Sequence, residues 1–114
     1  MIQTAQGPEV ERAIALFLNA LRQNFAVDEV RLYGSRARGD FQPGSDVDLA
    51  IVLRGPRGDI WDTAWTMSDI AFDVLLETGV FVSPLPLWDG DLDHPERAKN
   101  PALMRNIQRE GLRL

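Results

Sequence analysis

The segment DVDLAIVL, residues 46–53, constrains the fold most strongly, because it is charged only at its first and third positions. Residues two apart in a β-strand point to the same face. One face therefore carries Val47, Leu49, Ile51 and Leu53, and the other carries Ala50 and Val52 behind the two aspartates. A strand that is apolar on both faces needs cover on both faces. We expect this strand to be covered on both sides within an α/β domain.

The apolar spacing along the chain predicts helices and strands in alternation. Pro8 suits the first position of a helix, where its missing N–H costs nothing. Asn100 and Pro101 suit the start of the last helix, and Gly111 its end. The helices are predicted at residues 8–25, 35–39, 59–78 and 101–110, and the strands at 29–33, 46–53 and 80–87. This order indicates one small α/β domain over residues 1–114.

Two prolines place the strand predicted at 80–87 at an edge of the sheet. Pro84 and Pro86 are two residues apart, so both lack an N–H on the same side of the strand. That side cannot complete a ladder of hydrogen bonds. The strand is therefore predicted to have a neighbour on one side only.

The helix predicted at 59–78 has more apolar surface than one sheet contact needs. One apolar stripe contains Ile60, Ala64, Met67, Ala71, Val74 and Leu75. A second stripe contains Trp61, Trp65, Phe72 and Leu76. We expect this helix to be wedged between the sheet and the first helix, which accounts for both stripes. The alternative is that the second stripe is a surface for a partner.

The charge balance limits the classes of partner. The 114 residues carry a formal net charge of −5 and include no cysteine. Direct nucleic-acid binding is disfavoured, because such proteins are expected to be basic. A disulfide framework and a cysteine metal site are excluded. The sequence has no apolar run of membrane-spanning length and no signal-peptide pattern. A cytoplasmic protein without membrane association is expected.

The two aspartates at the start of the central strand predict a metal site. Asp46 and Asp48 point to the same face, where their charges repel. One of them should then have a raised pKa unless a cation lies between them. Mg²⁺ suits this position, because it binds one or two carboxylates together with substrate phosphates.

The preceding turn supplies groups that suit a phosphate. Gly34 lets a phosphate approach the backbone, and Ser35 at a helix start offers a hydroxyl beside backbone N–H groups. Arg36 and Arg38 can pair with phosphate oxygens. A helix-capping role for Ser35, or surface and turn roles for the aspartates, would explain each residue separately. Their combination favours a nucleoside triphosphate site.

The motif Gly34-Ser35, ten residues, then Asp46-Val47-Asp48 resembles the DNA polymerase beta-type nucleotidyltransferase superfamily, and the stretch is similar to its minimal nucleotidyltransferases. The resemblance implies a small mixed sheet flanked by helices. It implies that Asp46 and Asp48 hold Mg²⁺ as catalytic residues, and that Gly34 and Ser35 hold the triphosphate of ATP. The implied reaction is in-line attack on the α-phosphorus with loss of pyrophosphate.

The sequence departs from this superfamily in one respect. Active members usually add a third carboxylate from a later strand. The strand predicted at 80–87 has none, and Ser83 is its one polar side chain. The other carboxylates considered are Asp40, Asp73, Glu77 and Asp89. Asp73 and Glu77 fit a solvated helix face better than a metal site. His94, in a polar loop, is interpreted as a surface residue.

Three functions follow from this resemblance. Minimal nucleotidyltransferases are often paired with a helical HEPN protein, a toxic ribonuclease, to which they transfer AMP as antitoxins. The first hypothesis is such a transfer. The second is a catalytically degenerate member that neutralises its HEPN partner by binding. The third is a nucleotidyltransferase subunit that modifies a small molecule or RNA. In each case the acceptor surface is expected from another molecule or from a second copy of this chain.

Overall fold

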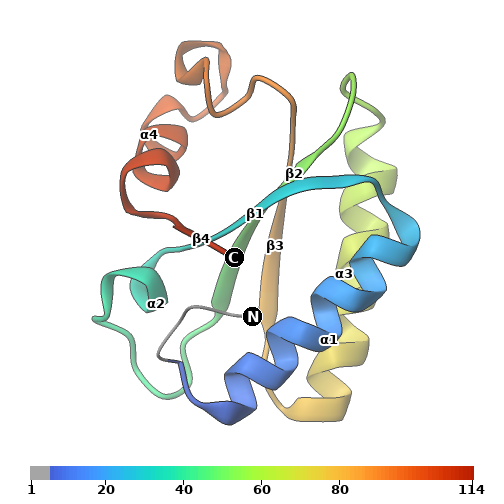
Figure 1. Cartoon of the computed structure of the whole chain (residues 1–114), viewed down its shortest axis with the longest axis vertical. Helices are drawn as coiled ribbons and strands as arrows, with labels where there is room; N and C mark the ends of the chain where they lie inside the picture. Colours follow the sequence, from blue (N-terminus) through green and yellow to red (C-terminus); the bar gives the residue numbers. More distant parts are fainter. Residues whose placement is uncertain (1–5) are drawn as a thin grey trace.

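The computed structural model describes residues 6–114 (Figure 1). Helices and strands alternate along most of the chain, as the apolar spacing predicts. The elements are α1 (Pro8–Asn24), β1 (Val27–Tyr33), α2 (Ser35–Arg38), β2 (Val47–Leu53), α3 (Ile60–Thr78), β3 (Val82–Trp88), the 3₁₀ helix η1 (Pro95–Arg97), α4 (Pro101–Glu110) and β4 (Leu112–Arg113). None of the helices in this part of the chain is both long and apolar enough to cross a membrane.

The strands form one mixed sheet in the order β3-β2-β1-β4. β2 pairs in parallel with β3 and antiparallel with β1, and β1 pairs antiparallel with β4. Helices α1 and α3 lie on one face of the sheet and α4 lies on the other (Figure 1). This is the small mixed sheet flanked by helices that the resemblance implies.

The predicted cover on both faces of β2 is confirmed. Its first face, which includes Leu49 and Ile51, packs with α1 and α3 in the larger apolar core. Its second face contributes Ala50 and Val52 to a smaller core beneath α4, with Met104 and Ile107. Every residue of β2 is buried except Asp48, which is partly exposed. The one polar side chain inside this strand therefore lies at the margin of the smaller core.

The edge position of β3 is also confirmed, because β2 is its one neighbour in the sheet. Pro84 pairs with Leu49 and Pro86 with Ile51 along the parallel ladder. The other edge of the sheet is β4, which was not predicted. Its two residues are too few to show an alternating pattern, and their pairing with Arg31 and Leu32 depends on the docking of α4.

Helix α3 packs against both the sheet and α1, as expected, but this packing does not account for its second apolar stripe. Met67, Ala71 and Val74 of the first stripe are buried against the core, whereas Ile60 at its start is exposed. The second stripe faces solvent, with exposed fractions of 80% for Trp61, 74% for Trp65, 56% for Phe72 and 70% for Leu76. The prediction that the wedge accounts for both stripes is therefore wrong. The helix packs on α1 and the sheet along one side, and no part of residues 6–114 covers its aromatic side.

Candidate active site

Gly34 is the single residue between β1 and α2, and its conformation brings this turn against Asp48. Its φ of 75° and ψ of −156° lie in a region that glycine alone occupies readily. A Cβ atom at this position would lie 2.5 Å from Oδ2 of Asp48. The carboxylate of Asp48 therefore occupies the space that any other side chain at position 34 would fill. The structure thus brings the Gly-Ser turn and the second aspartate together.

The strand register identifies the neighbours of Asp48 in the sheet. Asp48 pairs with Tyr33 of β1 on one side and with Ser83 of β3 on the other. Paired residues share a face, and here it is the face covered by α4, since Tyr33 packs against the smaller core. Tyr33 was not predicted as a site residue. Its position immediately before Gly34 was visible in the sequence, but its pairing with Asp48 depends on the register.

Ser83 lies where a third carboxylate would be expected. It is the β3 residue directly beside Asp48. Within residues 6–114, no group of three or more histidine, cysteine or acidic side chains is placed to hold a metal ion. The described part of the chain therefore places no third carboxylate with Asp46 and Asp48.

Electrostatics support the close approach of the two aspartates. Burial and then the negative charge of Asp46 raise the pKa of Asp48, while Arg38 acts in the opposite direction. Burial and the charge of Asp48 raise the pKa of Tyr33 to about 12. Asp48 thus experiences the repulsion from Asp46 that the sequence predicts. Asp46 is exposed, so the pair offers carboxylate oxygens to a hard divalent cation from solvent.

Arg38 is exposed on α2 and belongs to a small charged cluster beside the aspartates. Its Nε atom donates to Oδ2 of Asp40 at 3.2 Å, and its Nη1 atom lies 3.6 Å from Oε2 of Glu110. The hydrogen bond to Asp40 is the main reason that the pKa of Arg38 is raised. Asp40 therefore pairs with Arg38. Since surface pairs of this kind are weak, Arg38 can exchange them for a phosphate.

Arg36 requires a correction, because it does not offer its guanidinium to a phosphate. Its side chain is only 4% exposed. Its Nε donates to the backbone oxygen of Ser45 at 3.0 Å and its Nη2 to that of Pro43 at 3.3 Å. Its Nη1 donates to Oε1 of Gln6 at 3.2 Å, and the guanidinium lies 4.6 Å from the ring centre of Phe41. Arg36 holds the loop that leads into Asp46, so its role is to position that loop.

The remaining polar residues considered from the sequence lie elsewhere. Asp73 and Glu77 are exposed on α3, and Glu77 pairs with Arg12 of α1 at 3.2 Å. Asp89 accepts a hydrogen bond from the backbone N–H of Gly55 at 2.8 Å. His94 is exposed, and its Nδ1 lies 3.3 Å from Oε1 of Glu96. The surface interpretation of Asp73, Glu77 and His94 is confirmed.

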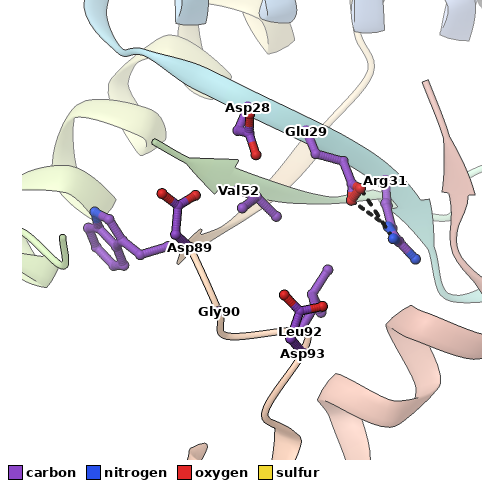
Figure 2. Close-up of a pocket in the computed structure, with 9 residues that line it drawn as sticks. Asp28, Glu29, Arg31, Val52, Asp89, Gly90, Leu92 and Asp93 are labelled. Atoms are coloured by element: carbon purple, nitrogen blue, oxygen red, sulfur yellow. Dashed lines mark hydrogen bonds and ion pairs between the residues drawn. The ribbon is translucent and has the colours of Figure 1, made fainter. Parts of the chain in front are cut away.

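A cavity of about 310 Å³ lies beside Val52 near the end of β2 and Trp88 at the end of β3 (Figure 2), and Asp48 is not one of its lining residues. Its lining includes the acidic residues Asp28, Glu29, Asp89 and Asp93. Figure 2 shows Glu29 paired with Arg31, and the Nε of Arg31 donates to Oε2 of Glu29 at 2.9 Å. This hydrogen bond is the main reason that the pKa of Glu29 is lowered. The cavity is therefore separate from the paired aspartates, and we do not assign it to the same chemistry.

Comparison with known proteins agrees with the geometry. The family model of the nucleotidyltransferase domain matches residues 14–106. A candidate protein adenylyltransferase of Methanocaldococcus jannaschii is 35% identical over 77 residues, which cover 66% of this chain and 70% of that protein. The crystal structure of a candidate nucleotidyltransferase from Sulfolobus solfataricus superimposes with a TM-score of 0.58 at 22% identity. That match covers 96% of this chain and 88% of the other, and it shows a shared fold.

Proposed function

This chain belongs to the nucleotidyltransferase domain family, and we propose on that premise that it transfers AMP from ATP to a hydroxyl group of a partner protein. The observation that carries the proposal is the contact of Gly34 with the carboxylate of Asp48. It joins the turn expected to hold phosphates to the aspartates expected to hold a cation. The protein acceptor is supported by the relative described as a candidate protein adenylyltransferase.

We propose that Asp46 and Asp48 hold Mg²⁺. The donor set fits, because burial and then the charge of Asp46 raise the pKa of Asp48, and a divalent cation would relieve the repulsion between the two carboxylates. Bound Mg²⁺ would neutralise charge that develops on the triphosphate during displacement. Ser83, beside Asp48, is too weak a ligand to replace a carboxylate. The site is therefore proposed to have two strong protein ligands.

The chain's own residues divide the remaining work. Gly34 lets the carboxylate of Asp48 lie against this turn, and the hydroxyl and N–H of Ser35 are proposed to donate to phosphate oxygens. Arg38 is proposed to leave Asp40 and pair with the outer phosphates. In the transfer, the acceptor oxygen bonds to the α-phosphorus and the bond to the β-phosphate oxygen breaks. Pyrophosphate leaves, and the hydroxyl proton passes to solvent.

We further propose that the acceptor is a HEPN-domain protein, for which this chain acts as the antitoxin. The support is the resemblance of Gly34-Ser35 and Asp46-Val47-Asp48 to minimal nucleotidyltransferases. A HEPN protein co-expressed with this chain can be incubated with ATP and Mg²⁺ and examined by intact mass. A gain of one or more AMP units is expected. It should disappear with Asp46→Asn/Asp48→Asn and persist with Asp28→Asn/Asp93→Asn, which removes the same charge at the far end of the sheet.

A second function is favoured by Ser83, which stands where a third carboxylate is expected. In this alternative the chain neutralises its partner by binding without transfer. The partner would then gain no mass, and Asp46→Asn/Asp48→Asn would still protect cells from the toxin. Labelling of RNA or a small molecule, with no labelled protein, would instead support the third hypothesis.

A further inference from the structure

The uncovered side of α3 is an apolar surface larger than isolated exposed residues produce. We define the α3 aromatic face as Trp61, Trp65, Phe72 and Leu76, which are 56–80% exposed. Their spacing of four, seven and four residues places them in one stripe along the helix. Side chains of this size expose several hundred Å² together, an order of magnitude typical of interaction surfaces. Within the described chain, α1 and the sheet pack against the other side of α3.

An acidic row borders one side of this face. At 100° per residue, Asp62, Asp69, Asp73 and Glu77 follow the aromatic stripe on one side. The other side is bordered by the uncharged residues Ala64, Ser68 and Leu75. Helix α3 contains no lysine or arginine, and among residues 6–114 the ion pair that reaches this row joins Glu77 to Arg12. The surface is therefore apolar along its centre and negatively charged along one border.

This charge pattern selects one kind of occupant. A second copy of α3 would bring a second acidic row and no basic side chain. In a symmetric antiparallel pair, both rows would lie along the same border of the interface. A helix of another protein, with an apolar stripe and a row of lysine or arginine along one side, would cover the aromatic face and pair with the acidic row. We propose that the α3 aromatic face binds such a basic-bordered helix of a partner protein.

The proposed surface and the paired aspartates lie on opposite faces of the sheet. Asp48 shares the face covered by α4, whereas α3 packs on the other face. The inference extends the proposed function by naming the chemistry of the partner and the surface that holds it. The aspartates do not contribute to the α3 aromatic face. An experiment can therefore show AMP transfer without helix binding at this face, or helix binding without AMP transfer, and the two proposals can fail separately.

The test uses two designed helical peptides with the same leucine stripe. One has a row of lysines beside the stripe and the other has glutamates in the same positions. Trp61 and Trp65 are exposed whereas Trp88 is 4% exposed, so docking should shift tryptophan fluorescence to shorter wavelength. The lysine peptide should bind, with weaker binding at high salt, and the glutamate peptide should bind at least about tenfold more weakly.

Substitutions in this protein identify which residues bind the peptides. Trp65→Ala/Phe72→Ala should weaken binding of the lysine peptide by about thirtyfold, whereas Leu112→Ala, at an exposed apolar residue outside the face, should not change it. Asp69→Lys/Asp73→Lys should reverse the preference in favour of the glutamate peptide. Equal binding of both peptides, or of neither, would overturn the proposal. So would a dimer in sedimentation that Trp65→Ala dissociates, since the occupant would then be a second copy.

Discussion

At the scale of single residues, Gly34 and Asp48 depend on each other. Gly34→Ala places a Cβ 2.5 Å from Oδ2 of Asp48 and also strains the backbone at φ 75°, a strain of about 1–3 kcal/mol. We expect a lower Tm and loss of Mg²⁺-dependent ATP binding, measured by thermal unfolding and calorimetry. Gly39→Ala is the matched control, because φ there is 89° but nothing lies within 4 Å of the added Cβ. It should lower the Tm and retain ATP binding; equal loss in both variants would contradict this account.

The raised pKa of Asp48 predicts a pH-dependent cost. The folded state holds the proton of the Asp48 carboxyl group more tightly than the unfolded state does. Protonated Asp48 therefore stabilises the fold fully below its ordinary pKa of 3.8, and this stabilisation is lost as the pH rises through the pKa of the folded state. Without Mg²⁺, Asp48→Asn should therefore raise the Tm at pH 7 by a few degrees at most, since about 1 kcal/mol corresponds to roughly 4 °C in a domain of this size. This increase in Tm should be smaller at pH 3.5, where Asp48 of the natural chain is largely protonated.

Mg²⁺ provides the control for this pH effect. At pH 7 it should raise the Tm of the natural chain and leave that of the Asp48→Asn variant unchanged, because the cation acts on the ionised pair. A destabilised Asp48→Asn variant in metal-free buffer would show that Asp48 supports the fold and is not held under repulsion.

The two arginines of the motif should behave differently. Arg36→Ala removes three hydrogen bonds from a buried guanidinium and leaves carbonyl oxygens unpaired, which should cost roughly 2–4 kcal/mol of unfolding free energy. Arg38→Ala removes only exposed pairs, so stability should hardly change. The affinity of the Arg38→Ala variant for ATP should fall by roughly tenfold. Chemical denaturation and ATP titration measure the two effects, and the reverse pattern would contradict the assignment.

The sequence could not distinguish these arginines. They stand two residues apart in the same short segment, and both suit phosphate. Their difference arises because the loop before Asp46 folds over Arg36, with Ser45 and Pro43 supplying acceptors. Such contacts depend on the path of a loop that has no periodic pattern. The same limit applies to Tyr33, whose proximity to Asp48 follows from a strand register.

At the scale of elements, β2 and β3 determine which side chains can join the site. Their parallel register places Ser83 directly beside Asp48. Ser83→Asp should therefore add a carboxylate at this position and raise the affinity for Mg²⁺ by about tenfold or more, as measured by calorimetry. Leu85→Asp would place a carboxylate beside Ala50 in the smaller core, so it serves as a negative control that should destabilise the fold. Unchanged Mg²⁺ affinity in Ser83→Asp would contradict the assignment of this position.

The apolar patterns of individual elements predicted most of the architecture. The two-sided pattern of β2 required layers on both faces, and paired prolines placed β3 at the edge. The sequence did not predict as well which elements pack against one another. Helix α3 shows two apolar stripes in its sequence, but burial depends on whether a neighbour exists for the second, and none covers it within residues 6–114.

At the scale of the whole molecule, the sheet separates the proposed partner surface from the proposed nucleotide site. The acidic row lies on α3, whereas Arg105, Arg109 and Arg113 are exposed along α4 and β4 on the other side of the sheet. The α4 side also carries Asp28, Asp89 and Asp93 around the cavity beside Val52, so acidic side chains occur on both faces. Because the sheet lies between the partner surface and the nucleotide site, substitutions in one can be tested without altering the other.

Calorimetric titration of ATP into the protein, once with Mg²⁺ and once with EDTA, determines whether Asp46 and Asp48 form a metal-dependent nucleotide site. We expect ATP binding that requires Mg²⁺, is lost in Asp46→Asn/Asp48→Asn and is retained in Asp28→Asn/Asp93→Asn, which carries the same change in charge. ATP binding that is equally strong in EDTA, or that survives replacement of both Asp46 and Asp48, would contradict the assignment of these two aspartates to the nucleotide site.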